Sequence, residues 1–250
     1  PDYSSAASDV YKRQILTHSE TSTGVINDLE TISSYIQEHK EALSIIDCVT
    51  SLGACNVPVD KWKLDIVASG SQKGYMIPPG LSFISMSKKA WKASEKSNLP
   101  KFYLNLQSYK KSLLNNSNPY TPAVNLVFAL DEALKMMQNE GLDNIFLRHN
   151  KHKLAMSNAM KALNLELFAD EKYLSPSITA IKTGEIDAEK FRKIIKNKFD
   201  ILLAGGQDQL KGKIFRVGHL GYINDRDIIT IISAISYVLL DLGKITPKQA

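Results

Sequence analysis

Residues 65–73, which read DIVASGSQK, contain the pattern on which the fold of this chain depends. The mostly apolar run at 65–68 predicts a buried strand, and the polar turn at 69–73 indicates where that strand ends. Short apolar runs at 43–46 and 81–86 predict two further strands. Amphipathic stretches alternate with these runs over the first half of the chain, a pattern typical of βα units that build a mostly parallel sheet.

Two residues with useful chemistry follow the predicted strands directly. Asp47 comes at the end of the strand at 43–46, and Lys73 closes the turn after the strand at 65–68. Open α/β sheets bind their ligands beyond the carboxyl ends of the strands. The sequence therefore predicts a site at this edge of the sheet.

The second half of the chain predicts a smaller α+β domain. Thr121 and Pro122 have the residue types of a helix N-cap and a first helical position, and Gly141 predicts the end of that helix. Further elements are expected as helices at 144–163, at 187–199 and after position 224, and as strands at 177–181, near 201 and at 213–217. We therefore divide the chain into a large sheet domain with an interdomain helix, 15–135, and a small domain, 136–250.

Residues 1–14, PDYSSAASDVYKRQ, have neither the apolar stretch of a signal peptide nor an amphipathic stripe. The string resembles translated sequencing-adapter sequence joined to a coding frame. We expect a non-native, adapter-derived tail here, and a native reading frame that begins near Ile15.

Composition narrows the classes of function. With 44% hydrophobic and 23% charged residues the balance is that of an ordinary globular protein. The net charge is +5, but the basic runs lie in predicted helices without interleaved aromatic residues, so we expect no nucleic-acid partner. Two serines and an aspartate interrupt the apolar run at 228–242, which predicts a buried helix and no membrane association. Cys48 and Cys55 are too few for a disulfide framework or a thiolate metal site, and they fit the reducing cytoplasm.

Several residues form a chemically coherent set. The Lys73 amine can form a Schiff base and move a proton, and the Asp47 carboxylate can hold a proton on a ring nitrogen. Ser71 and Gln72, in the same turn, can donate hydrogen bonds to a phosphate, and Arg216 can bind a carboxylate through its planar fork. These are the groups that an enzyme using pyridoxal phosphate must supply. Each of them alone is also common on protein surfaces and in turns, so the interpretation depends on their joint order.

The segments around these residues resemble class V aminotransferases, in particular the serine–pyruvate or alanine–glyoxylate branch. The stretches that carry the resemblance are THSETSTGV at 17–25, DCVTSLG at 47–53, SGSQK at 69–73, PPG at 78–80 and FRVGHLG at 215–221. The 26-residue spacing between Asp47 and Lys73 also suits the family, and the likeness extends from Ile15 to about Gly243. It implies fold type I of the pyridoxal-phosphate-dependent transferases, with part of a mostly parallel large domain and a smaller α+β domain at the carboxyl end.

The resemblance also implies roles for individual residues. Lys73 matches the catalytic lysine that holds the cofactor as a Schiff base, and Asp47 matches the partner of the pyridine nitrogen. Gln72 matches a ligand of the cofactor phosphate, and Arg216 matches the arginine that binds the α-carboxylate of the substrate.

Two threonines receive a role only through the resemblance. Thr21 matches a hydroxyl beside the cofactor ring, and Thr121 matches a residue that reaches the phosphate in the neighbouring subunit. The N-cap role of Thr121 is compatible with that contact. Residues 118–120 depart from the Tyr-His-His of some family members. A shared active site of this kind implies a homodimer.

The function that the resemblance implies is transamination between a small amino acid, alanine or serine, and a 2-oxo acid, glyoxylate or pyruvate. A lyase or desulfurase is an alternative, but desulfurases carry a histidine before the lysine and a later catalytic cysteine, whereas Gln72 and two earlier cysteines stand here. Some relatives are labelled as soluble hydrogenase components, but two cysteines cannot supply their clusters. A catalytically incomplete fragment is the last alternative, because the family's phosphate loop and ring-stacking aromatic lie upstream of Ile15.

Two further features have ordinary structural explanations. His219 lies between a predicted strand and a turn, where a lone histidine is more often structural than a substrate contact. Gly205 and Gly206 lack the pattern of a phosphate loop and indicate a tight turn before the Arg216 strand.

Overall fold

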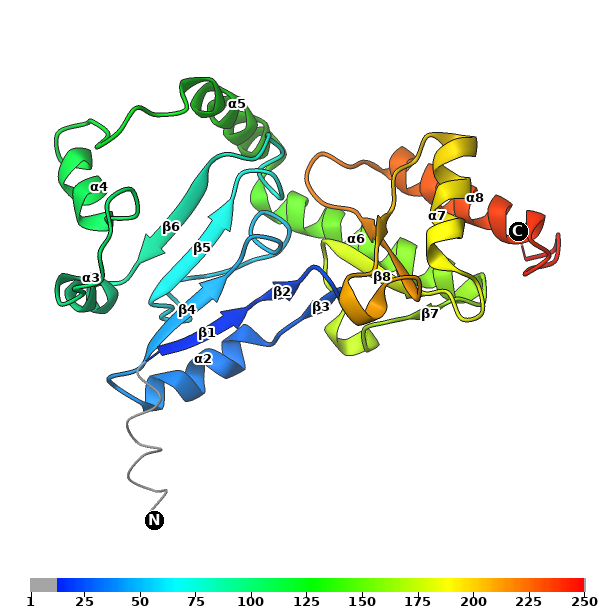
Figure 1. Ribbon diagram of the computed structural model, residues 1–250, viewed down its shortest axis with the longest axis horizontal. Helices are drawn as coiled ribbons and strands as arrows, with labels where there is room; N and C mark the ends of the chain where they lie inside the picture. Colours follow the sequence, from blue (N-terminus) through cyan, green and yellow to red (C-terminus); the bar gives the residue numbers. More distant parts are fainter. Residues whose placement is uncertain (1–12, 250) are drawn as a thin grey trace, which may run out of the picture.

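The computed structural model describes residues 13–249 and contains two main sheets, one at each end of the molecule (Figure 1). Of the expected tail, residues 1–12 lie outside the described residues. Arg13 and Gln14 are instead the first two residues of strand β1 (Arg13–Thr17), which pairs in parallel with β4 (Leu43–Asp47). The sheet therefore begins two residues before the predicted start of the native frame.

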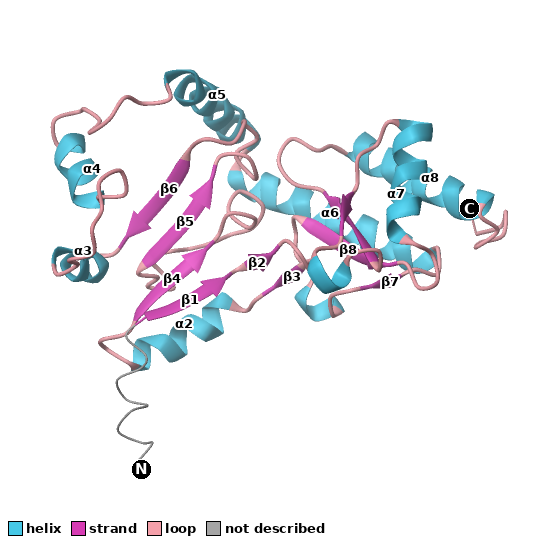
Figure 2. Cartoon of the chain, in the orientation of Figure 1, coloured by secondary structure: helices cyan, strands magenta, loops and turns pink. Residues whose placement is uncertain are grey.

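The first sheet has the strand order β1-β4-β5-β6, with β5 (Ile66–Gly70) and β6 (Ser82–Met86). Strands β1, β4 and β5 are parallel, and only β6 runs antiparallel to its neighbour (Figure 2). The predicted mostly parallel sheet is confirmed. Helix α2 (Leu29–Glu38) buries Leu29 against the core residues of β4 and β5, while α3 (Lys88–Glu95) and α4 (Leu106–Leu113) follow β6.

Helices α5 (Val124–Glu140) and α6 (Leu142–Ala162) connect the two ends of the molecule. The predicted stop at Gly141 is confirmed, since this residue follows α5 with a φ of 84°. The predicted start is wrong, because Ala123 is the N-cap and Thr121 is an exposed residue two positions earlier. The Val124 N–H donates to the Pro122 carbonyl at 2.9 Å, and Ala123 has φ −76° and ψ 75°. This inverse γ-turn delays the helix by two residues.

The second sheet has the order β7-β8-β10-β9 and is antiparallel throughout. Its elements are β7 (Glu166–Leu167), β8 (Ile178–Lys182), β9 (Ala204–Gly205) and β10 (Ile214–Gly218), with 3-10 turns at Glu171–Tyr173 and Asp208–Leu210 and helices α7 (Ala188–Phe199) and α8 (Asp225–Asp241). Phe191 and Phe215 stack at 5.2 Å in the core between α7 and the sheet. A small α+β domain is therefore present, although the strand expected near Ile201 lies at β9 instead.

A short hairpin of β2 (Ser19–Glu20) and β3 (Val25–Ile26) joins the first sheet to the small domain. The Ser175 N–H donates to the Gly24 carbonyl at 2.9 Å. Gly24 has a φ of +70°, and a Cβ there would lie 3.1 Å from the Ala180 nitrogen, so the approach requires glycine. Among the described residues, no helix has the length and apolar character needed to cross a membrane.

Candidate active site

The turn that carries Lys73 begins where β5 ends. The Ser71 side chain, at its start, is hydrogen-bonded to the far end of the loop. The Ser71 hydroxyl donates to the Pro78 carbonyl at 2.8 Å and accepts from the Leu81 N–H at 3.2 Å. Ser71 is fully buried. A serine hydroxyl has one proton to donate, and here that proton is used inside the loop. In this structure the Ser71 hydroxyl holds residues 71–81 together, and its contact with the phosphate stays a prediction.

Gly74 allows the Lys73 turn to touch the loop that follows β4. A Cβ on Gly74 would lie 2.2 Å from the Leu52 carbonyl oxygen and 2.9 Å from the Gly53 Cα. Gly53 has a φ of +84°, which is accessible to glycine at little cost. Two glycines therefore let the two loops meet backbone to backbone, directly beside Lys73.

Asp47 is the last residue of β4 and lies opposite Ala68 of β5 in the parallel register. Its side chain is exposed, and its Oδ1 accepts the Val49 N–H at 2.8 Å. Within residues 13–249, neither Oδ2 of Asp47 nor the Nζ of Lys73 has an ion pair or hydrogen bond. The structure thus places an available carboxylate and an available amine on adjoining loops at one edge of the sheet.

The hydroxyl of Thr21 faces a second threonine, Thr50, which sequence reasoning did not single out. The two Oγ1 atoms are 2.6 Å apart, and the buried Ser177 hydroxyl of the small domain donates to the Thr50 carbonyl at 2.6 Å. Thr50 is 5% exposed. Its position in the stretch DCVTSLG, three residues after Asp47, was the available signal.

Arg216 lies on β10 in the small domain and is held from two directions. Its Nε donates to the Gly205 carbonyl at 2.8 Å, and its Nη1 donates to the Thr21 carbonyl at 2.8 Å. Burial and nearby Arg192 lower the pKa of the Arg216 guanidinium from its usual value, while the Glu20 carboxylate acts in the opposite direction. Among the described residues Nη2 has no hydrogen-bond partner. The guanidinium is therefore oriented, with part of its fork left for a ligand.

Within the described chain, the side chains of Gln72 and Thr121 form no hydrogen bond with the other candidate residues. Gln72 is exposed, and its Oε1 lies over Gly70, where an added Cβ would approach it to 3.0 Å. Thr121 is exposed in the segment between α4 and α5. The roles assigned to both residues stay predictions.

Two buried histidines flank this region. His219 is fully buried; its Nε2 lies 2.8 Å from the Thr179 hydroxyl, and burial lowers its pKa to about 3, in agreement with the structural role expected for it. His18, which sequence reasoning did not single out, lies 3.0 Å from the Ser51 hydroxyl, and burial lowers its pKa to about 4. Both histidines are therefore neutral at physiological pH.

The tight turn predicted at Gly205 and Gly206 is not what the structure shows, because Gly205 belongs to strand β9 and Gly206 continues its pairing with β10. Gly205 pairs with Phe215 as part of β9, and the Gly206 N–H donates to the Ile214 carbonyl at 3.2 Å. A Cβ on Gly206 would lie 2.0 Å from the Leu210 carbonyl oxygen. These two glycines shape the strand that holds the Arg216 Nε.

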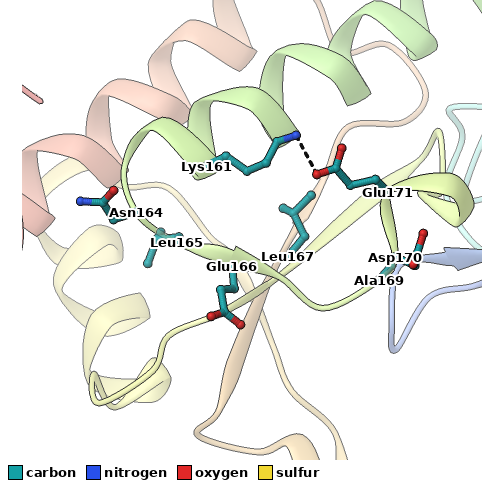
Figure 3. A pocket seen from close by; sticks show the side chains of 8 residues that line it. All are labelled: Lys161, Asn164, Leu165, Glu166, Leu167, Ala169, Asp170 and Glu171. Carbon is teal, nitrogen blue, oxygen red and sulfur yellow. Dashed lines mark ion pairs between the residues drawn. The ribbon is translucent and has the colours of Figure 1, made fainter.

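An open hollow of about 570 Å³ lies elsewhere, between the end of α6 and β7 (Figure 3). Its charged lining residues are mostly acidic, and Lys161 pairs with Glu171 at 3.0 Å. None of the candidate site residues lines it, so this hollow does not belong to the site at Lys73.

The sequence profile described as Aminotransferase class-V matches residues 3–224, which is most of the chain. The chain belongs to the class V aminotransferases. The match includes most of the segment that was expected to be a non-native tail. Pyridoxal phosphate is the cofactor of this family, as expected from the sequence.

Individual relatives cover the same region. The chain is 59% identical over 93% of its length to "Soluble hydrogenase 42 kDa subunit" of Anabaena cylindrica, and spans 61% of that protein. It is 35% identical over 94% of its length to serine–glyoxylate aminotransferase of Methylorubrum extorquens, again spanning 61%. The crystal structure of alanine–glyoxylate aminotransferase from Nostoc sp. has a TM-score of 0.87 at 29% identity, covering 94% of this chain and 64% of that one. The chain thus has fold type I and spans about 60% of the relatives' length.

The residues present fit pyridoxal phosphate by their donor chemistry. Lys73 offers an amine without an ion pair, Asp47 an exposed carboxylate, and Thr21 a half-buried hydroxyl. Lys73 and Asp47 lie at the carboxyl ends of the parallel strands, and Thr21 lies in the adjoining hairpin. An aldehyde, a ring nitrogen and a ring hydroxyl are the groups that they would meet. Gln72 remains as a side-chain donor for the phosphate.

Proposed function

We propose that the whole protein transfers the amino group of a small amino acid, alanine or serine, to a 2-oxo acid, glyoxylate or pyruvate. The observation that best supports this proposal is the arrangement of three residues. Lys73 and Asp47 lie on adjoining loops of the large domain, and Arg216 of the small domain is bonded to the hairpin beside them. Amine, carboxylate and guanidinium are then presented together.

Each residue has a definite task in that reaction. Bound pyridoxal phosphate supplies an electron sink for the pair left behind when the α-proton departs. Lys73 would hold the cofactor at rest, and after the substrate amino group displaces it, the free Nζ amine would accept the proton from the substrate α-carbon and return it to C4′ of the bound cofactor. The Asp47 carboxylate keeps the pyridine nitrogen protonated. Arg216 binds the α-carboxylate of the substrate and orients the α-proton toward Lys73.

A homodimer with a shared active site belongs to the same proposal. Helix α5 exposes Val124, Val127 and Phe128, which are 50%, 47% and 71% exposed, close in sequence to Thr121. Apolar residues gathered on one exposed face are typical of a protein interface. Light scattering of the full-length protein tests this, and a monomer at micromolar concentration would contradict it. For location we propose the cytoplasm, because both cysteines are free thiols.

A desulfurase is disfavoured by the state of the two thiols. Burial raises the pKa of Cys48 to about 11 and that of Cys55 to about 12. The nucleophile in such chemistry is a thiolate, and neither thiol ionises at neutral pH. Gln72, in the position before Lys73, also differs from the histidine of the desulfurases.

A redox subunit is the function suggested by the printed name of the Anabaena relative. Nickel–iron and iron–sulfur centres need several ligands close together. In residues 13–249, no three histidine, cysteine, aspartate or glutamate side chains are placed to hold a metal ion. The side chains described in residues 13–249 therefore favour amino transfer over a metal-based redox role.

The proposal is tested with the full-length protein supplied with pyridoxal phosphate, alanine or serine, and glyoxylate. We expect glycine and the matching 2-oxo acid in equal amounts by mass spectrometry. Arg216→Lys replaces a planar fork with a point charge, so we expect KM for the amino acid to rise about tenfold or more while cofactor affinity changes little. Arg226→Lys, at an exposed arginine of α8, is the matched control.

Absence of glycine from the loaded wild-type protein would contradict the proposal, and equal loss of cofactor and amino-acid affinity in R216K would contradict the role of Arg216. The 250-residue chain, assayed in parallel, addresses the fragment alternative. Turnover by this chain alone would show that it contains a complete site, and its inactivity beside an active full-length protein would show that it does not.

A further inference from the structure

We propose that Thr50 is a positioning residue that sets the geometry of the substrate-carboxylate site by fixing Thr21, whose carbonyl holds Arg216. This inference rests on the proposed transamination. Three hydrogen bonds meet at the junction of the two domains: Thr21 to Thr50, Ser177 to Thr50 and Arg216 to Thr21.

Thr21 lies in the turn of the β2–β3 hairpin and is only half-buried. Its side chain is held by the Thr50 hydroxyl at 2.6 Å, and its carbonyl accepts from Arg216 Nη1 at 2.8 Å. The Ser22 N–H, in the same peptide unit as the Thr21 carbonyl, donates to Glu20 Oε1 at 2.8 Å, and the Gly24 N–H donates to the Glu20 carbonyl, so the turn holds this peptide from within. Among the described residues, the Thr50 contact is the hydrogen bond that ties the Thr21 side chain to the loop after β4.

Thr50 is itself held by a residue of the small domain. It is 5% exposed, and its carbonyl accepts the Ser177 hydroxyl at 2.6 Å. Ser177 is fully buried, and its N–H donates to the Ser175 hydroxyl oxygen at 3.1 Å. Because Ser177 precedes β8 and Arg216 lies on the neighbouring strand β10, Thr50 is tied to the same sheet that carries Arg216.

These contacts form a continuous chain of hydrogen bonds from the large domain to the small domain. Arg216 is anchored at Nε by Gly205 within its own domain, and at Nη1 by Thr21 from the other. A planar guanidinium with two anchors has one orientation, and bidentate binding of a carboxylate depends on that orientation. Loss of the Thr50 hydroxyl leaves the Thr21 peptide held only by its own turn, so Arg216 retains its charge but its anchor at Nη1 is less firmly placed relative to the large domain.

The test uses the full-length holoenzyme with Thr50→Val, which removes the hydroxyl and keeps a β-branched side chain. The probe is α-aminoisobutyrate, an amino acid without an α-hydrogen, whose dissociation constant is read from the cofactor absorbance without turnover. We expect that constant to rise about fivefold to tenfold, the effect of losing one hydrogen bond. KM for alanine should rise by a similar factor, with kcat within about twofold of wild type.

Two variants separate positioning from a general loss of structure. Thr50→Ser retains the hydroxyl and should restore wild-type binding of α-aminoisobutyrate. Thr183→Val is the matched control, because Thr183 is also buried and its hydroxyl donates one bond, to the Lys213 carbonyl at 3.1 Å, away from the site. Where Thr50→Val does not fold, Ser177→Ala carries the test, since it removes the donor to the Thr50 carbonyl and should weaken binding in the same direction.

Binding of α-aminoisobutyrate by Thr50→Val within about twofold of Thr183→Val, with both proteins folded, would overturn the role of Thr50. That result leaves the proposed function standing as long as the wild-type protein holds pyridoxal phosphate in a borohydride-reducible link and transfers amino groups. If the wild-type protein does neither, the proposed function is wrong and the inference about Thr50 falls with it.

Discussion

Gly74 offers the sharpest test of how the site is assembled, because the backbone of another loop occupies the place of its missing side chain. In Gly74→Ala the new Cβ would lie 2.2 Å from the Leu52 carbonyl oxygen and 2.9 Å from the Gly53 Cα. The first distance is shorter than a normal contact by about 1 Å, and neither neighbour is a flexible side-chain end. The two loops must therefore separate by about 1 Å, at a cost of about 1–3 kcal/mol in the free energy of unfolding.

The functional loss should exceed what that destabilisation explains. Lys73 directly precedes Gly74, so it moves with the turn. The loop from which the turn separates follows Asp47, so the distance between Lys73 and Asp47 changes as well. A misplacement of about 1 Å in a catalytic group lowers the rate about 100-fold, so we expect this loss in kcat of the full-length protein. The assays are thermal unfolding and amino transfer at saturating pyridoxal phosphate, measured on the same preparations.

Gly184→Ala is the matched control for that experiment. Gly184 has a φ of +56° with no atom within 4 Å of the added Cβ, so the substitution introduces backbone strain without a clash. We expect a loss of about 1–2 kcal/mol in stability and unchanged kcat. Wild-type kcat in Gly74→Ala, or an equal fall in Gly184→Ala, would refute the idea that contact between the two loops positions Lys73.

Two other predictions follow from buried polar groups. Ser71→Ala removes both hydrogen bonds that close the 71–81 loop, so we expect the free energy of unfolding, measured with urea, to fall by about 1–3 kcal/mol. Unchanged stability with a loss of affinity for the cofactor phosphate would instead support the predicted role of Ser71 as a phosphate ligand. Burial lowers the pKa of His18 and His149 to about 4 and that of His219 to about 3, from 6.5. The unfolded chain therefore binds more protons below pH 6.5, and the free energy of unfolding should fall by about 1 kcal/mol per histidine between about pH 7.5 and pH 5.5; equal stability at both values would contradict the burial of these neutral rings.

The strands around the site were predictable because their signals are local. The mostly apolar runs at 43–46 and 65–68 end in polar turns, and β4 and β5 lie there to within a few residues. The position of Asp47 and Lys73 on adjoining loops followed from the parallel order of the strands. The start of α5 was not predictable from residue types, because Pro122 accepts a bond from Val124 that only the folded turn reveals.

Contacts between distant residues explain the remaining differences. Thr50 pairs with Thr21, 29 positions away, and with Ser177, 127 positions away, so the stretch DCVTSLG indicates that Thr50 is near Asp47 but not which residues it contacts. The same limit applies to Ser71, whose motif suggests a phosphate ligand. Its partners Pro78 and Leu81 return to it only once the loop is folded.

The claim that Lys73 holds the cofactor is tested most directly by locating the covalent link. The full-length protein is mixed with pyridoxal phosphate, reduced with borohydride, digested and examined by mass spectrometry. We predict a pyridoxyl group on the peptide that contains Lys73 in the wild-type protein and in Lys88→Ala, a control at an exposed lysine of α3, and no such group in Lys73→Ala. A reduced link formed by Lys73→Ala to the same extent as by wild type would contradict the account.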